Sequence, residues 1–451
     1  MSSAKSYLTA DERKIFYSSA GGWGLDAMDI CIFSLVIPSL LAAFAIGRGN
    51  VGILATAALI SSAFGGWLGG IISDRVGRLV VLRWTIAWFS IATIICGLVH
   101  GYTTFLIFRI LQGFGFGGEW AVGAVLMGEI IRSELRGKVV GAVQSAYAIG
   151  WAVALLLFSS VFSLFSGPDA WRYLFVIAGL LGFPLFVMRM RMKLPADYLA
   201  RMDIARRAHQ QASVSTSLWD IFRGPYFSRT AIASLMCLGI QGGGYSLTVW
   251  LPTFLQQTRH LSVLHTTGYL SVYVAGSFCG YLGAAYLSDL IGRRIKIMLF
   301  AAGALVIVVS YLSLPITNGM MMLLGFPLGF FMLGIYSGLG PLLTELYPTR
   351  LRGAGQGFCY NFGRGIGAVL PAVVGFLSLT LGLAHSIVAF SGACYVLVCL
   401  CAFLLPETTA LKLETREQED QLFLDGRRRT AGEHMPPRET ADTSRISSPK
   451  I

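Results

Sequence analysis

The sequence is poor in charged residues. Only 13% of its 451 residues are Asp, Glu, Lys or Arg, whereas 55% are hydrophobic. A soluble globular domain carries charge on about a quarter of its residues. The composition therefore excludes an ordinary soluble protein and indicates that lipid surrounds most of the chain.

The sequence also lacks the residue patterns of catalytic and metal sites. No Ser/His/Asp set, metal-ligand spacing or phosphate-binding loop occurs in it. The segment from Gly113 to Gly117 is rich in glycine, but it lies inside an apolar run and is interpreted as helix packing. The eight cysteines lack CxxC spacing and are interpreted as packing residues. We expect neither an enzyme nor a cofactor.

Long apolar runs dominate the rest of the chain. A membrane-spanning helix needs about 20 such residues, and the sequence predicts twelve spans: 16–44, 51–73, 81–99, 103–127, 138–162, 171–190, 229–256, 265–288, 295–315, 319–344, 353–379 and 385–405. The predicted fold class is all-α integral membrane. We divide the chain into an N-terminus (1–15), a first bundle of six helices (16–190), a connector (191–228), a second bundle (229–406) and a tail expected to be disordered (407–451).

The basic residues behind the net charge of +12 indicate how the chain is oriented in the membrane. Of 35 Lys and Arg residues, three (Arg48, Arg172, Arg259) are predicted on one side of the membrane and two (Arg109, Arg364) well inside helices. This leaves 35 − 3 − 2 = 30 on the other side, either outside the spans or at their ends. Basic residues stay in the cytoplasm during insertion. We therefore predict a multi-pass protein of the inner cell membrane with both termini cytoplasmic, and no nucleic-acid partner.

An internal repeat divides the chain into two halves. GGWLGGIISDRVGR at 65–78 returns as GYLGAAYLSDLIGRR at 280–294, and the interval from Asp74 to Asp289 is 289 − 74 = 215 residues. A second pair, Glu129 and Glu345, is separated by 345 − 129 = 216 residues. Parallel repeats in an apolar chain are typical of transporters that bind their substrate between the two halves.

The repeated loops resemble the signature of the major facilitator superfamily, read here as Gly70-I-I-S-Asp74-Arg75-V-Gly77-Arg78. The resemblance implies two pseudo-symmetric six-helix bundles, with helices 1, 4, 7 and 10 along a central pathway. Leu25-Asp26-Ala27-Met28-Asp29 on helix 1 is similar to a motif of the sialate and aromatic-acid proton symporters. Helix 5 lacks the Gly-Pro pair of the drug antiporters, which disfavours drug export.

Four ionisable residues inside the predicted spans are candidates for proton coupling, because a charge in the bilayer needs a partner, water or a function. Asp26 and Asp29 share one face of helix 1, where burial and mutual repulsion favour protonation. Arg109 and Glu119 lie ten residues apart on helix 4, and we expect Arg109 to pair with an acid in the empty state. A solvated carboxylate pair and a permanent structural ion pair remain the alternatives.

Arg364 on helix 11 is predicted to clamp an organic anion, because a guanidinium binds a carboxylate through two hydrogen bonds. A structural bond between helices is the alternative. The segment from Gln241 to Tyr245, with three glycines between them, is expected to let backbones come close and to offer a break in helix 7 at the site. The other predicted substrate-binding residues are Asn361, Tyr360, Gln144, Tyr147 and Tyr336, although such tyrosines also serve as membrane-interface anchors.

The charged residues of the repeated loops are predicted to form a cytoplasmic gate rather than to bind substrate. They are Asp74, Arg75, Arg78, Glu129, Arg136, Asp289, Arg293, Glu345 and Arg352.

The sequence therefore predicts a transporter that imports a small organic acid together with protons by alternating access, acting as a monomer. A carrier of neutral sugars, a metabolite exporter and a non-transporting membrane sensor remain as alternatives, since a fold does not dictate its function.

Overall fold

The computed structural model describes residues 8–131, 133–165, 167–195, 198, 218–348 and 351–407. Most of the predicted connector and the predicted tail beyond 407 lie outside these residues. Within the described ranges every regular element is a helix. The first half holds α1 (Ala10–Ala43), α2 (Arg48–Val76), α3 (Arg78–Leu98), α4 (Tyr102–Ile130), α5 (Ser133–Leu164) and α6 (Ala170–Arg191).

The second half begins with the short helix η1 (Leu218–Phe222), and three of its six spans consist of more than one helix. The first span is α8 (Tyr226–Thr248), α9 (Leu251–Thr253) and the π-helix η2 (Phe254–Thr258). Two further spans are divided into α12 (Asn318–Gly334) with α13 (Leu339–Glu345), and α14 (Arg352–Gly367) with α15 (Leu370–Leu381). The continuous spans are α10 (Val263–Ile291), α11 (Arg293–Ser313) and α16 (Leu383–Leu404).

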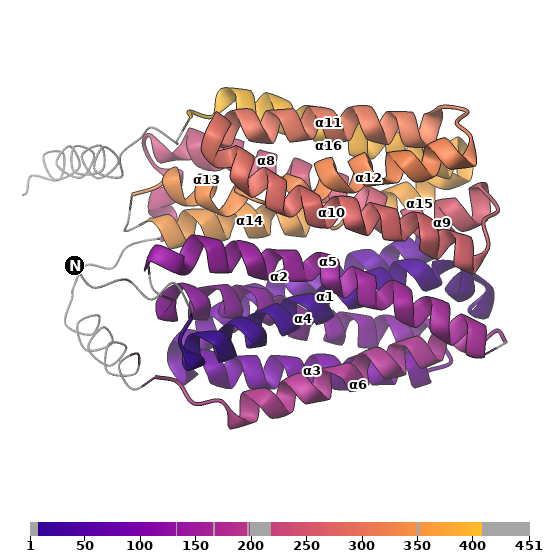
Figure 1. Cartoon of the computed structure of the whole chain (residues 1–451), viewed down its shortest axis with the longest axis horizontal. Coiled ribbons are helices and arrows are strands. Elements are labelled where there is room, and N and C mark those ends of the chain that lie inside the picture. The colour runs from indigo at the N-terminus through magenta and orange to yellow at the C-terminus, as the bar shows by residue number, and fades with distance from the viewer. Residues whose placement is uncertain are drawn as a thin grey trace, which may run out of the picture.

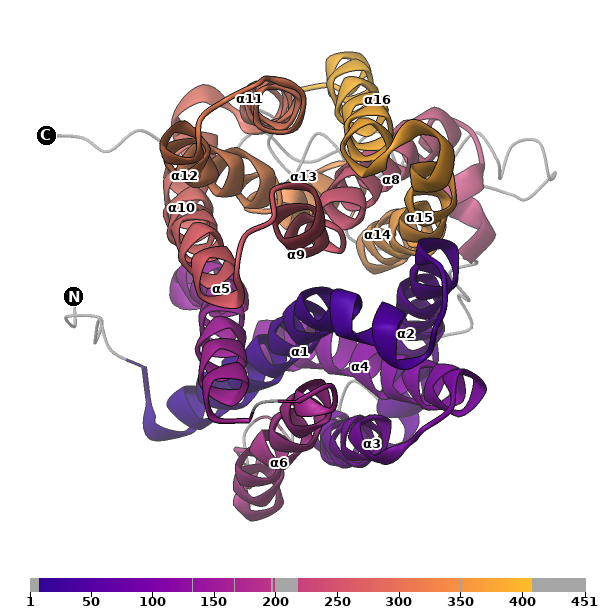
Figure 2. The ribbon, with the colours of Figure 1, turned by 90° about the vertical axis from the view of Figure 1, so that its right-hand side faces the viewer.

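Twelve spans follow from this count. Eleven segments of the described chain are long and apolar enough to cross a membrane, and α4, with 29 residues, adds the twelfth. The predicted all-α membrane fold is confirmed. Figures 1 and 2 show α1 to α6 gathered on one side of the molecule and α8 to α16 on the other.

The first helix starts earlier than predicted, and a capping box explains why. The Thr9 hydroxyl accepts from the amide of Glu12 at 3.2 Å, while the Glu12 carboxylate accepts from the amide of Thr9 at 2.8 Å. These bonds satisfy amide donors that a helix start leaves free. The polar residues before Phe16 therefore belong to the same helix as the apolar run.

The same close helix crossing occurs in both halves. A Cβ on Gly113 of α4 would lie 2.2 Å from the carbonyl oxygen of Ala58 on α2. A Cβ on Gly329 of α12 would lie 2.0 Å from that of Tyr273 on α10. These pairs are separated by 329 − 113 = 216 and 273 − 58 = 215 residues, the repeat interval of the sequence. Glycine at these positions lets two helices pack backbone to backbone, as small residues do in membrane bundles.

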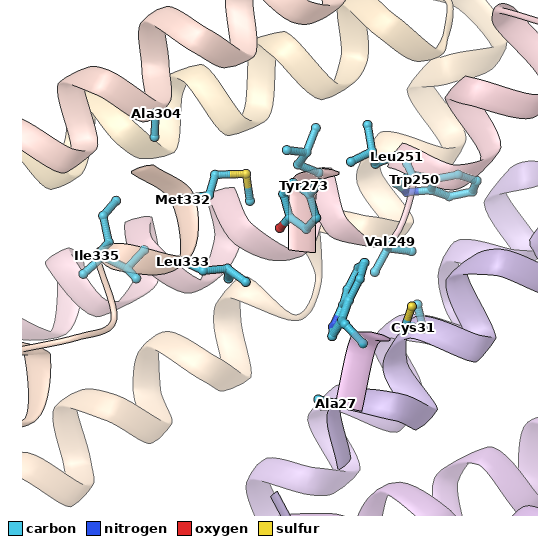
Figure 3. Close-up of a cluster of buried hydrophobic side chains, with 14 of the residues drawn as sticks. Ala27, Cys31, Val249, Trp250, Leu251, Tyr273, Ala304, Met332, Leu333 and Ile335 are labelled. Atoms are coloured by element: carbon cyan, nitrogen blue, oxygen red, sulfur yellow. The ribbon is translucent and has the colours of Figure 1, made fainter. Parts of the chain in front are cut away.

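Contacts between the halves gather at one end of the molecule. We call the end that carries Arg78 and Arg293 the gate end, and the opposite end the far end. Across the boundary α1 packs against α9, α2 against α15 and α5 against α10. The rings of Trp151 on α5 and Tyr273 on α10 lie 5.7 Å apart. Figure 3 shows Ala27 and Cys31 of α1 on one side of this region and the segment from Val249 to Leu251 on the other.

The predicted break between Gln241 and Tyr245 is wrong, whereas the predicted close approach of backbones is present: a Cβ on Gly367 would lie 2.8 Å from the backbone nitrogen of Gly242. Helix α8 runs unbroken through these residues and ends at Thr248. The glycines serve packing instead: a Cβ on Gly242 would lie 2.7 Å from Leu370, and one on Gly244 would lie 2.8 Å from the Tyr336 hydroxyl.

Candidate functional site

Asp29 and Arg109 form a closed, buried cluster between α1 and α4. Arg109 Nη1 donates to Asp29 Oδ2 at 2.9 Å and to Gln112 Oε1 at 2.5 Å. Gln112 Nε2 in turn donates to Asp29 Oδ1 at 2.7 Å and to Thr93 at 2.6 Å. The acid that the sequence predicts beside Arg109 is thus Asp29. Gln112 was not among the predicted residues, although it lies one helical turn from Arg109.

Glu119 lies elsewhere, in a second buried ion pair. Its Oε1 accepts from Arg189 Nη1 at 2.6 Å and from Thr85 Oγ1 at 2.5 Å. Arg189 has no exposed surface and also donates to the hydroxyl and carbonyl of Ser18 and to the carbonyl of Leu82. Arg189, which the charge count places on the cytoplasmic side, is therefore an interior residue and not one in contact with water.

Periodicity was the available signal for Arg189. Trp171, Ala178, Leu185 and Arg189 all lie on the buried face of α6. The apolar face of this helix therefore extends to the arginine.

Asp26 is buried without a partner. Its exposed fraction is 2%, and neither carboxylate oxygen has a hydrogen-bond partner. Arg364 of the second half is its strongest electrostatic neighbour, followed by Glu119 and Asp29. No ion pair joins Asp26 to Arg364 among the described residues. An ionised carboxylate in such a place is costly unless it takes up a proton or gains a partner.

Arg364 faces the first half from α14. It is 4% exposed, its Nε atom has no partner, and its guanidinium carbon lies 5.1 Å from the ring centre of Phe116 on α4. Tyr245, Tyr360 and Asp26 are among its electrostatic neighbours. The residue therefore offers hydrogen-bond donors where the halves meet.

Three of the predicted polar residues of the second half, Tyr245, Gln241 and Tyr360, are connected by hydrogen bonds. Tyr245 donates to Gln241 Oε1 at 3.0 Å, and Gln241 Nε2 donates to the carbonyl of Tyr360 at 3.2 Å. The Tyr336 hydroxyl donates to the carbonyl of Ile240 at 3.3 Å. Asn361 donates to Gly357 of its own helix at 2.9 Å. Its amide group is thus engaged by backbone.

Two predicted residues come from α5 in the first half. Tyr147 lies near Tyr245 and Asp26, and its ring lies 5.4 Å from that of Trp23. The side-chain oxygen of Gln144 is buried and has no hydrogen-bond partner. Both halves therefore supply polar groups to one region.

A small cavity adjoins this region. Asp29, Phe33, Arg109 and Phe116 line it from the first half, and Tyr245 and Val249 from the second. Its apolar walls with a few polar groups are of the kind found in small-molecule sites.

The gate residues of the first half pair within their own half. Arg78 donates to both oxygens of Glu129, at 2.9 and 3.3 Å, and to Ser73 at 2.8 Å. Tyr198 donates to Glu129 at 2.7 Å. Burial and this bond to Glu129 raise the pKa of Tyr198 well above its usual range, so the phenol stays a neutral donor.

The second half repeats the arrangement. Arg293 Nε lies 3.6 Å from Glu345 Oε1, and Arg293 Nη1 donates to Ser288 at 3.1 Å. Glu407 accepts from the amides of Arg293 and Arg294 at the start of α11, at 3.0 and 3.2 Å. Arg352 donates to the carbonyl of Thr344 at 3.1 Å.

The other predicted gate residues add less. Arg75 is exposed on the last turn of α2. The side chains of Asp74, Arg136 and Asp289 lie outside the described residues.

Lys296, a further basic residue that the charge count places on the cytoplasmic side, is also buried. It has no exposed surface and shares the buried face of α11 with Phe300 and Ala304. Its spacing of four residues from Phe300 was the available signal.

The comparisons with known proteins agree with this architecture. A family model described as Major Facilitator Superfamily matches residues 21–370 and 269–446. The chain belongs to this superfamily. It is therefore a membrane transporter and not an enzyme.

Two curated relatives cover most of the chain. The probable 4-methylmuconolactone transporter of Cupriavidus pinatubonensis is 38% identical, over 91% of this chain and 94% of that protein. The niacin transporter NiaP of Acinetobacter baylyi is 28% identical, over 78% of this chain and 84% of its own length. Among solved structures, the D-xylose-proton symporter matches with a TM-score of 0.70 at 18% identity, covering 89% of this chain and 99% of that one.

Proposed function

We propose that this superfamily member imports a small monocarboxylic acid together with one proton. The observation that carries the proposal is the unpaired juxtaposition of Asp26 from the first half and Arg364 from the second, both buried. A guanidinium is suited to binding a carboxylate. A carboxyl group without hydrogen-bond donors is suited to binding a proton.

A count of charges supports one carboxylate per proton. Asp29 balances Arg109, and Glu119 balances Arg189, which leaves Asp26 and Arg364 as the opposite charges free to respond. In the empty state their charges sum to zero. In the loaded state the substrate carboxylate neutralises Arg364 and Asp26 holds a proton, so the sum is again zero. A second carboxylate would add an uncompensated charge in a region of low dielectric.

The same count gives a reason for proton coupling. Carrying one negative charge into a cell against a potential of about 100 mV costs about 2.3 kcal/mol. A proton that travels with the anion removes this cost. The named relatives, transporters of 4-methylmuconolactone and of niacin, fit a small organic acid.

The remaining assignments follow from the architecture. The asymmetric distribution of basic residues supports an inner-membrane location with both termini in the cytoplasm. The gate end is then cytoplasmic, and the helix contacts at the far end close the outer side. One chain supplies both halves of the site, which supports a monomer. Arg78 with Glu129 and Arg293 with Glu345 brace the helix ends that move when the gate end opens and closes.

Uptake into proteoliposomes tests the proposal, with niacin and benzoate as monocarboxylate probes and cis,cis-muconate as a dicarboxylate probe. We expect an inward proton gradient to drive uptake of a monocarboxylate, and a membrane potential alone to leave it unchanged. A pH dye inside the vesicles should report one proton per substrate. Preference for muconate, or uptake that responds to potential, contradicts the charge count.

The variant Asp26→Asn isolates the proton site. It should lose gradient-driven accumulation and retain exchange of substrate across the membrane, because the neutral amide imitates the protonated acid. Asp11→Asn, which removes an exposed carboxylate from the same helix, is the matched control and should behave as wild type. Full gradient-driven uptake by Asp26→Asn removes Asp26 from the mechanism.

A further inference from the structure

A buried lysine fills the break between α12 and α13. Lys296 Nζ on α11 donates to the carbonyls of Gly334 and Ile335 at 3.0 Å each, and to the carbonyl of Ser337. No carboxylate pairs with this ammonium among the described residues. Figure 3 shows the ribbon leaving the helix after Leu333, at Ile335. A broken helix inside a membrane exposes carbonyls that must be satisfied, and the three donors of an ammonium meet three of them.

The two halves treat a buried cation at the same depth in different ways. Glu119 on α4 corresponds by the repeat interval to residue 119 + 216 = 335, which is Ile335. In the first half Glu119 neutralises Arg189 and α4 runs without interruption. In the second half the carboxylate is missing, and the opened helix end supplies carbonyls to Lys296 instead. The negative end of the α12 dipole favours a cation there.

The break has the geometry of a joint. Gly338 begins α13 with φ +92°, a left-handed conformation that glycine adopts readily. A Cβ at this position would lie 2.9 Å from Ser288 Oγ and 3.6 Å from Lys296 Nζ. Helix α13 has only seven residues, and an irregular turn joins it to α12.

This joint connects the gate end with the candidate substrate site. Tyr336 lies in the turn itself, and its hydroxyl reaches Ile240 on α8. At its other end α13 finishes at Glu345, which faces Arg293 in the first turn of α11. The turn before α13 is thus attached to the start of α11 through Lys296, and the end of α13 through Arg293.

We propose that Lys296 is a positioning residue of the transport cycle: it holds the break open as a joint, so that α13 moves at the gate end while Tyr336 keeps its place at the site. The first half has no such joint in α4 and moves as a rigid body. This role concerns the rate of conformational exchange and does not depend on which substrate is carried or on whether protons are coupled.

The test compares Lys296→Met with Lys14→Met, which removes an exposed lysine near the start of α1. The purified variants are measured for niacin or benzoate binding by thermal shift and calorimetry, and for exchange in proteoliposomes without a proton gradient. For Lys296→Met we expect a Kd close to that of wild type and an exchange rate lower by about tenfold or more, because gate motions set many turnover rates. Lys14→Met should match wild type in both.

A second variant tests the joint in case Lys296→Met does not fold. Gly338→Ala leaves Lys296 in place but adds a side chain to the joint at a residue with positive φ. It should likewise lower the exchange rate while the Kd stays close to that of wild type. Exchange at the wild-type rate in Lys296→Met overturns the proposal, as does an equal loss of binding and exchange. If neither variant yields folded protein in size-exclusion chromatography, Lys296 is a structural residue and the proposal is also overturned. Failure of Asp26→Asn to uncouple protons leaves this result unaffected.

Discussion

Removing the carboxylate of Glu119 should destabilise the first half strongly. The variant Glu119→Gln leaves the Arg189 guanidinium, which has no exposed surface, without a counter-charge. Loss of one partner of a buried ion pair costs about 3 to 5 kcal/mol. Arg189 keeps its bonds to Ser18 at 2.9 Å and to Leu82 at 2.7 Å. We therefore expect the lower value, about 3 kcal/mol, or about a hundredfold in the unfolding equilibrium.

A double variant that changes both Glu119 and Arg189 tests whether Glu119 only neutralises Arg189 or also carries a proton. If Glu119 serves only to neutralise Arg189, then Glu119→Gln combined with Arg189→Met should lose less stability than the two single changes added together. Unfolding in mixed micelles, followed as SDS is titrated, measures the free energies. The reasoning is refuted if Glu119→Gln unfolds as wild type does and yet fails to couple uptake to a proton gradient.

Two further predictions concern the site and the helix packing. Arg364→Lys should weaken binding of a carboxylate probe by about tenfold, because a lysine lacks the two-bond geometry of the guanidinium. Its melting temperature should stay within a few degrees of the wild-type value. A wild-type affinity measured by calorimetry rules out the clamp. Gly113→Ala and Gly329→Ala should each yield little folded protein, since the new methyl groups would lie 2.2 and 2.0 Å from carbonyl oxygens. The control Gly357→Ala, with open space around the new methyl group, should fold normally as judged by size-exclusion chromatography. Equal yields of all three variants would contradict the packing argument.

The sequence predicts the fold well because its signals are local. An apolar run of about 20 residues reports a span whatever it packs against, and the repeat interval relates the two halves. The site is predicted less completely, because its pairings depend on which helices become neighbours. Asp29 and Asp26 stand three residues apart, yet only Asp29 meets Arg109. That difference arises from α4, 80 residues away in the chain.

The buried cations were missed for a physical reason. Arg189 and Lys296 stand next to other basic residues at helix ends, where positive charge usually marks the cytoplasmic side. Composition does not distinguish a side chain that turns toward water from one that turns inward. The helical face does: both residues continue an apolar stripe that is buried along its length.

The contact between Trp151 and Tyr273 gives the molecule an intrinsic optical reporter. The indole belongs to one half and the phenol to the other, and the indole nitrogen is buried without a hydrogen-bond partner. Any rotation that separates the halves at this point replaces the contact between the two rings with contact between the indole and water or lipid. The emission of Trp151, one of nine tryptophans in the chain, should therefore change with each opening.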